Sequence, residues 1–151
     1  MTEKIGIGTN IVCQVGLVVK DIEKSKKAYA DVFGVPEPAV METNPETGKP
    51  VYHGERTQAY AKLAFFDMGQ VQIELIEPVG EPSTWKEALD AQGEGFHHIA
   101  FMVKGTDEVV AYLEGKGGTL VQQGHYTGGM YSYVDMPSLH LVLELLENFG
   151  T

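Results

Sequence analysis

The stretch Gln14-Val-Gly-Leu-Val-Val-Lys-Asp21 occurs a second time, in altered form, as His98-Ile-Ala-Phe-Met-Val-Lys-Gly105. The alignment continues without gaps, so residues 14–34 match residues 98–118. Val19 falls on Val103 in this alignment, and other apolar positions match in the same way. The chain is therefore predicted to contain two copies of one structural module.

Each copy ends in a second matching segment. Residues 71–77 (VQIELIE) align with residues 141–147 (LVLELLE), which places Glu74 on Glu144. Residues that can bind a metal thus stand at equivalent points of the two copies: Gln14, Glu74, His98 and Glu144. A two-fold repeat with a ligand on each terminal strand can build a single shared metal site.

The helices of the two copies are marked by residues at their ends. Asp21 can cap a helix over residues 22–33, and Gly34 supplies the left-handed residue that ends it. In the second copy, Thr106 is expected to cap the helix and the glycine pair 117–118 to end it.

The remaining periodicity predicts strands and an α+β fold of two βαβββ modules. The predicted strands cover residues 11–19, 59–67, 70–77, 97–103, 118–123, 129–135 and 139–146. Residues 35–58 contain four prolines and are expected to be mostly loop that covers a cleft.

The chain is predicted to be a single domain over residues 1–151. Its first module covers about residues 10–78, and its second covers about residues 94–148. Residues 79–93 form the linker between them, with a short helix near 84–91.

Strand alternation puts the four repeat-equivalent residues on faces opposite the apolar core positions. Gln72 shares the face of Glu74, and His140 shares the face of Glu144, so both are candidates for contacting a substrate. Each polar residue alone is also typical of a half-exposed sheet. A buried carboxylate is costly unless it is paired or bound to metal, so the coincidence of all four favours a metal.

One imidazole, two carboxylates and one amide oxygen form a mostly hard ligand set. Such a set suits one divalent ion (Co, Ni, Mn, Zn or Mg) in five- or six-coordination. Open coordination positions could take two adjacent oxygens of a substrate, and the ion would polarise a carbonyl. Glu144 or Glu74 could then move a proton as the catalytic base.

Composition excludes several classes of partner. The chain has 11 basic and 21 acidic residues and a net charge of −10, which argues against binding to nucleic acid or an anionic membrane. No apolar run approaches the roughly 18 residues of a membrane span, and the first residues do not resemble a secretion signal. A cytoplasmic protein is expected.

The motifs together resemble those of the vicinal oxygen chelate superfamily. The resemblance rests on Val-Val-Lys-Asp (18–21), Ile-Glu-Leu-Ile-Glu-Pro (73–78), Gly-Phe-His-His-Ile-Ala-Phe (95–101) and Val-Leu-Glu-Leu (142–145). It implies a glyoxalase-like fold in which the modules share a partly open, β-barrel-like cleft. It also implies that His98, rather than His97, is the metal ligand, and that the protein is a homodimer.

Residues 74–98 most resemble the methylmalonyl-CoA epimerases within that superfamily. This resemblance implies a metal-dependent isomerase, epimerase or lyase that removes a proton beside the carbonyl of an acyl thioester or an α-hydroxy carbonyl compound. Lys62, Tyr60 and Tyr133 are candidates for a second acid or base.

Two other functions stay open. Gln14 stands where epimerases usually have histidine and makes the ligand set resemble that of some glyoxalase I (lactoylglutathione lyase) enzymes, although Leu17 replaces their arginine. From a different class, a non-catalytic small-molecule binder of the antibiotic-resistance type is the alternative.

Overall fold

The computed structural model describes residues 6–149, which form ten strands and four α-helices. The first half contains β1 (Gln14–Val18), α1 (Ile22–Phe33), β2 (Met41–Glu42), α2 (Pro45–Gly48), β3 (Val51–Tyr52), β4 (Glu55–Arg56), β5 (Tyr60–Asp67) and β6 (Gln72–Val79). The second half contains α3 (Thr84–Gln92), β7 (Gly95–Met102), α4 (Thr106–Glu114), β8 (Thr119–Tyr126), β9 (Gly129–Met136) and β10 (Leu141–Asn148). Within residues 6–149, none of the helices has the length and apolar character needed to cross a membrane.

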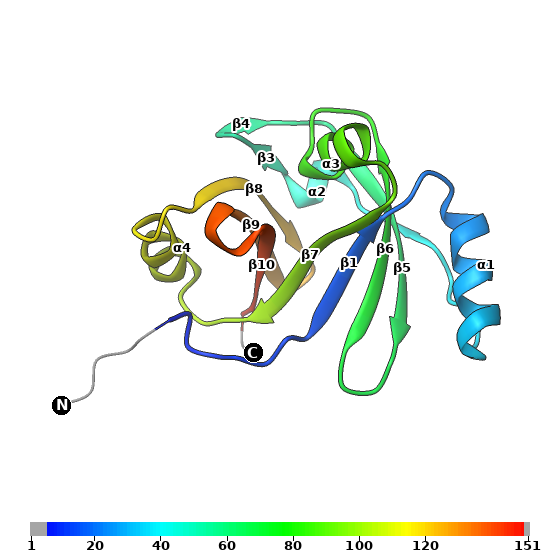
Figure 1. The fold of residues 1–151 in the computed structure, drawn as a ribbon. Coiled ribbons are helices and arrows are strands. Elements are labelled where there is room, and N and C mark those ends of the chain that lie inside the picture. Colours follow the sequence, from blue (N-terminus) through cyan, green and yellow to red (C-terminus); the bar gives the residue numbers. More distant parts are fainter. Residues whose placement is uncertain (1–5, 150–151) are drawn as a thin grey trace.

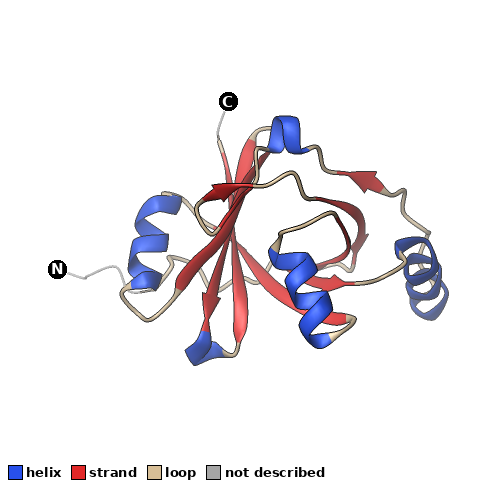
Figure 2. Cartoon of the chain, turned by 90° about the horizontal axis from the view of Figure 1, so that it is seen from above, coloured by secondary structure: helices blue, strands red, loops and turns tan. Residues whose placement is uncertain are grey.

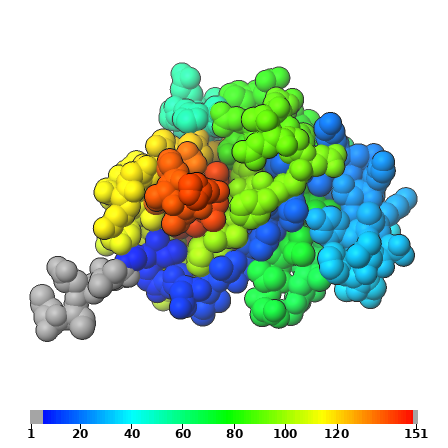
Figure 3. All heavy atoms as spheres, in the orientation of Figure 1, coloured from blue at the N-terminus to red at the C-terminus, as the bar shows by residue number. Residues whose placement is uncertain are grey.

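The strands make one mixed sheet in the order β2-β5-β6-β1-β7-β10-β9-β8-β3-β4. The two modules meet at β1 and β7, which are antiparallel and pack side by side (Figures 1 and 3). Gln14 pairs with Ala100 while Gly16 pairs with His98, and each pair is the repeat equivalent of the other. The predicted α+β fold of two modules is therefore confirmed, and the repeat is visible in the strand register.

The sheet curls into a half-barrel, with α1 and α4 outside it at opposite ends (Figures 1 and 2). One apolar cluster lies between α1 and its strands and includes Ile22 and Leu75. A second lies between α4 and its strands and includes Leu113 and Leu145. Because α1 and α4 pack on the convex side, they leave the concave side of the sheet free for a cavity.

The first helix follows the prediction closely. Asp21 accepts a hydrogen bond from the amide of Lys24, and Gly34 ends α1 with φ 65°. The second helix differs, because Gly105 rather than Thr106 is its N-cap and it ends at Glu114 rather than at residues 117–118. Its cap comes from a residue distant in the sequence.

That distant residue is Glu147 on β10. Its carboxylate accepts hydrogen bonds from the amides of Gly105 (3.0 Å) and Thr106 (2.9 Å) and from the Thr106 hydroxyl. Glu77, its repeat equivalent on β6, accepts from the amide of Ile22 at 2.9 Å. In each module the last strand therefore caps the helix of the same module.

The segment between α1 and β5 is mostly loop, as expected, but it has a specific path. Its β2 pairs with β5 at one end of the sheet, and its β3 pairs with β8 at the other end. The residues between them, including α2, therefore bridge the two edges of the half-barrel and close the concave side. We refer to residues 41–52 as the roof segment.

We expect Glu147→Gln to lower the midpoint of thermal unfolding at neutral pH. The hydroxyl of Thr106 and the amides of Gly105 and Thr106 hold the pKa of Glu147 below its usual value. The ionised carboxylate thus stabilises the fold above its unfolded pKa, and this contribution is lost as the pH falls through the folded pKa. The difference between variant and wild type should therefore shrink in acid. Glu114→Gln, at the exposed end of α4, is the control for loss of charge alone; an equal effect of both variants would contradict the capping role.

Candidate metal centre

Four neighbouring strands each contribute one polar side chain to the concave face. Gln14 lies on β1, Glu74 on β6, His98 on β7 and Glu144 on β10. Their exposed fractions are small: Gln14 7%, Glu74 7%, His98 0% and Glu144 5%. All four predicted metal ligands are therefore buried at one place in the structure, although nothing in the sequence fixes that burial directly.

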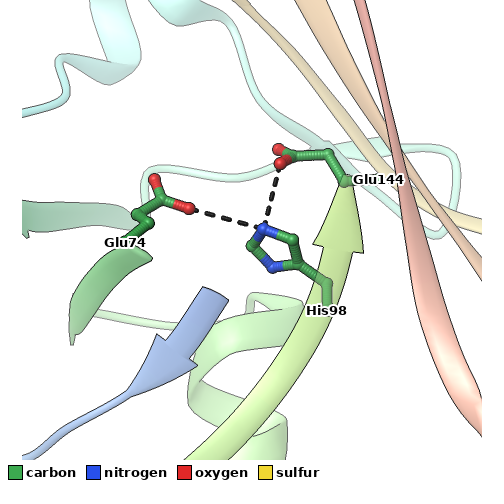
Figure 4. Close-up of side chains that lie close together, drawn as sticks. All are labelled: Glu74, His98 and Glu144. Carbon is green, nitrogen blue, oxygen red and sulfur yellow. Dashed lines mark ion pairs between the residues drawn. The ribbon is translucent and has the colours of Figure 1, made fainter. Parts of the chain in front are cut away.

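The four side chains converge on one point. His98 Nε2 lies 3.0 Å from Glu144 Oε1 and 3.4 Å from Glu74 Oε1, between the two carboxylates (Figure 4). Gln14 Oε1 lies 3.1 Å from His98 Nε2, and its amide nitrogen donates to Gln72 Oε1 at 2.7 Å.

The spacing of these atoms fits a hard divalent cation. The Gln14 oxygen is 2.9 Å from Glu144 Oε1 and 3.1 Å from Glu74 Oε1. These three oxygen atoms therefore direct their lone pairs at the same point in the cluster. Adjacent octahedral ligands at bonds of ~2.1 Å are separated by about 3 Å, which matches these separations. Turning the Gln14 amide would instead direct its NH₂ group at both carboxylates. The oxygen-inward orientation is the one that a cation requires.

The charges of the cluster are strongly coupled. Burial by itself lowers the pKa of His98, but the carboxylates of Glu144 and Glu74 outweigh it and raise that pKa to about 10. Burial raises the pKa of Glu74. Without a cation, the site therefore holds a proton at neutral pH.

His97 supports the neighbouring ligand. Its Nδ1 lies 2.8 Å from His98 Nδ1, and its Nε2 lies 3.2 Å from the Thr84 hydroxyl. Burial, followed by the charge on His98, lowers the pKa of His97 to about 3, so it stays neutral and can accept. This contact fixes the ring of His98 with Nε2 toward the cluster, as an outer partner of a metal-bound histidine does.

Gly16 is a site residue that the sequence interpretation missed. It lies opposite His98 in the β1–β7 pair, and a Cβ at this position would lie 2.1 Å from the His98 ring. A glycine inside a strand often marks such a close approach, and that was the available signal. The imidazole occupies the space that any side chain at position 16 would need.

The cluster opens into a cavity of about 420 Å³ beneath the roof segment. Of the predicted substrate residues, Gln72 and Tyr133 line this cavity. Tyr60 does not, because Ala59, Leu63 and Phe65 point inward and strand alternation turns Tyr60 to the other face.

The expected placement of His140 is wrong. His140 has φ 59° in the turn before β10, which begins at Leu141, so alternation counted back from Glu144 does not extend to it. It lines a separate cavity together with His97 and Asp135.

The family described as the Glyoxalase/Bleomycin resistance protein/Dioxygenase superfamily matches residues 13–134. The chain belongs to this superfamily. The match includes three of the four clustered residues and the whole β1–β7 junction.

Individual relatives are more distant. The uncharacterized protein YqjC of Bacillus subtilis (strain 168) is 30% identical over 89 residues, which are 58% of this chain and 54% of that protein. The chain thus spans about half the length of this relative. Methylmalonyl-CoA epimerase from Mycobacterium tuberculosis is similar in structure, with a TM-score of 0.66, 21% identity, and coverage of 99% of this chain and 94% of that one.

A second structure of an epimerase is similar to about the same degree. A single-residue variant of the Streptomyces coelicolor methylmalonyl-CoA epimerase, in complex with 2-nitronate-propionyl-CoA, gives a TM-score of 0.63 at 22% identity. The match covers 92% of this chain and 97% of that one. At these identities the likeness supports the glyoxalase-like fold, and the chemistry must be argued from the site.

We expect Gly16→Ala to weaken metal binding by roughly 100-fold, as loss of an outer support to a metal ligand does. The added methyl group must displace the His98 ring, whereas the strand can stay paired. Ala100→Gly, at the repeat-equivalent position, is the control and should bind metal like the wild type. Elemental analysis measures the metal content of both variants, and circular dichroism verifies that they fold. A folded Gly16→Ala protein with full metal content would contradict the predicted clash with the His98 ring.

Metal binding should release about one proton at neutral pH. Since the His98 pKa is raised to about 10, the metal-free imidazole is protonated, and a cation must replace that proton. At pH values below the pKa of His98, the affinity for the metal should therefore increase about tenfold for each unit by which the pH is raised. Titration calorimetry in two buffers of different ionisation enthalpy counts the released protons, and binding without proton release would contradict the predicted charge state.

Proposed function

We propose that the protein is a divalent-metal-dependent isomerase, epimerase or lyase that moves a proton on the carbon next to a carbonyl group. One observation carries the proposal: a fully buried imidazole stands between two buried carboxylates at the base of a cavity. Gln14, Glu74, His98 and Glu144 would hold the cation, and a bound cation supplies a Lewis acid that polarises a substrate carbonyl.

The carboxylates of Glu74 and Glu144 would do the proton transfer. They come from different modules and approach His98 from different sides (Figure 4). Burial raises the pKa of Glu74, so this carboxylate accepts a proton more readily than an exposed one. Inverting a carbon centre requires a proton to leave one face and return to the other, and two carboxylates held on different strands, β6 and β10, suit that requirement.

The proposed substrate is a small acyl thioester or α-hydroxy carbonyl compound. The similar epimerase structures support an activity of this kind, since one of them holds 2-nitronate-propionyl-CoA. A cavity of about 420 Å³ suits a small molecule. The homodimer implied by the resemblance stays a prediction, which sedimentation velocity would test.

The alternative functions have less support. For a lactoylglutathione lyase, position 17 would carry a cation for the glutathione carboxylate, but Leu17 packs in the apolar cluster with Ile22 and Leu75. A non-catalytic binder needs no ligand set, whereas here two carboxylates are kept buried at a considerable desolvation cost.

We expect purified, metal-loaded protein to contain about one divalent ion per chain, and His98→Ala to contain much less. Elemental analysis measures this directly. If the wild type and the variant both lack a tightly bound ion after reloading, the proposed function is wrong.

The roles of the two glutamates can be separated with enantiopure substrates in D₂O. Glu74→Gln and Glu144→Gln should each slow inversion of the carbon centre by roughly 10²- to 10⁴-fold. With one carboxylate left, each variant should still exchange the α-proton of one enantiomer, and the two variants should prefer opposite enantiomers. Glu55→Gln, on the exposed β4, is the control. Full inversion by either variant, measured by NMR and chiral chromatography, would exclude the two-carboxylate mechanism.

A further inference from the structure

The wall of the cavity is aromatic and apolar, and it lacks fixed positive charge. The chain has 11 lysines and arginines, yet among residues 6–149 none of them lines the cavity. The wall instead includes these aromatic residues: Phe65, Trp85, Tyr126, Tyr131 and Tyr133. A site built for an anionic ligand would place arginine or lysine here.

The charge balance points in the same direction. Glu74 and Glu144 together carry two negative charges, which one divalent cation neutralises. An anionic ligand would add an uncompensated charge beside aromatic side chains, where desolvation is costly. His125 also lines the cavity but is exposed, so water screens any charge that it carries.

The hydroxyl of Tyr133 is set up as a hydrogen-bond donor. Trp85 Nε1 donates to Tyr133 Oη at 3.0 Å, and an indole nitrogen can only donate. The Tyr133 oxygen is therefore an acceptor in this bond, and its own hydrogen is free for another partner. Burial keeps the pKa of Tyr133 well above its usual value, so the hydrogen stays in place.

Tyr131 is oriented by a second chain of hydrogen bonds. The backbone amide of Thr84 donates to Gln122 Oε1 at 2.8 Å, which fixes the orientation of the buried Gln122 amide. Gln122 Nε2 then donates to Tyr131 Oη at 3.1 Å. Within residues 6–149 no protein acceptor takes the hydrogen of either tyrosine, and both side chains line the cavity.

From this wall we infer that the natural ligand is an uncharged α-oxygenated carbonyl compound with an aromatic or apolar substituent, and that the hydroxyls of Tyr131 and Tyr133 donate to one of its oxygens. The inference rests on the proposed function, because the cation would take the other oxygens. It narrows the substrate class: the part of the substrate inside the cavity carries no carboxylate or phosphate. Charged portions of a larger substrate would have to lie outside the cavity.

A matched pair of probes tests this inference. Mandelamide and mandelate have nearly the same shape and are both α-hydroxy carbonyl chelators, but only mandelate is anionic. Trp85 is the single tryptophan of the chain and lines the cavity, so its fluorescence reports binding. We expect metal-loaded protein to bind mandelamide at least about tenfold more tightly than mandelate, although free divalent cations prefer the carboxylate.

The tyrosine donors are tested with conservative variants. Tyr131→Phe and Tyr133→Phe should each weaken mandelamide binding by about 5- to 10-fold, which corresponds to one lost hydrogen bond. Tyr60→Phe, which changes a residue outside the cavity, should leave the affinity for mandelamide unchanged. The wild-type comparison of the two probes needs no variant, so a folding defect in either tyrosine variant does not remove the test.

The outcomes separate the two proposals. Tighter binding of mandelate would overturn the inference about the substrate class. The proposed function would still stand if the protein binds about one divalent ion per chain. Unchanged mandelamide affinity in both folded tyrosine variants would overturn the role of the donors. If mandelamide is preferred to the same degree with and without the cation, the preference for neutral ligands is supported and the metal-dependent function is contradicted.

Discussion

The buried carboxylates of Glu74 and Glu144 are the constraint on which the structure depends. Removing two such charges from water costs on the order of several kcal/mol each unless opposite charge compensates them. The protonated His98 between them supplies one positive charge, and a divalent cation would supply two. Gly16 makes room for the imidazole, and His97 sets its orientation. These supporting residues have no evident purpose unless the cluster must keep a fixed geometry.

The repeat explains how two small modules produce one site. Each module pairs its first and last strands in parallel, with Gly16 beside Glu74 and Ala100 beside Glu144. The modules join through antiparallel β1 and β7, and this brings both pairs of equivalent positions, Gln14 with His98 and Glu74 with Glu144, to one concave face. The departures from symmetry mark the specialised roles, because the tyrosine donors lie on β9 alone and the bridging segment belongs to the first half alone.

The internal repeat, the family resemblance and local patterns in the sequence were together enough to predict the fold and the four clustered residues. Asp21, Gly34 and the alternation around Glu74 are local signals, and the gapless repeat gave the equivalence of Gln14 with His98. Prediction failed where a partner distant in the sequence decides the outcome. The cap of α4 comes from Glu147, which is 41 residues away from Thr106.

The same explanation applies within the cavity. His140 was misplaced because a turn at φ 59° interrupts the alternation that placed it beside Glu144. The donor role of Tyr131 depends on Gln122 and Thr84, three residues that no sequence period connects. Hydrogen-bond direction arises from tertiary packing, so it becomes visible only when the side chains are placed.

The roof segment has a further consequence for how such proteins diversify. Its residues contact the cavity but contribute none of the four clustered side chains, which all lie on the central strands of the sheet. The parts that hold the clustered side chains and the part that covers the cavity therefore lie on separate stretches of chain. Insertions, deletions and exchanges between residues 43 and 50 can alter ligand preference without disturbing the strand pairs that hold the centre. A protein organised in this way can acquire new specificities while its chemistry stays unchanged.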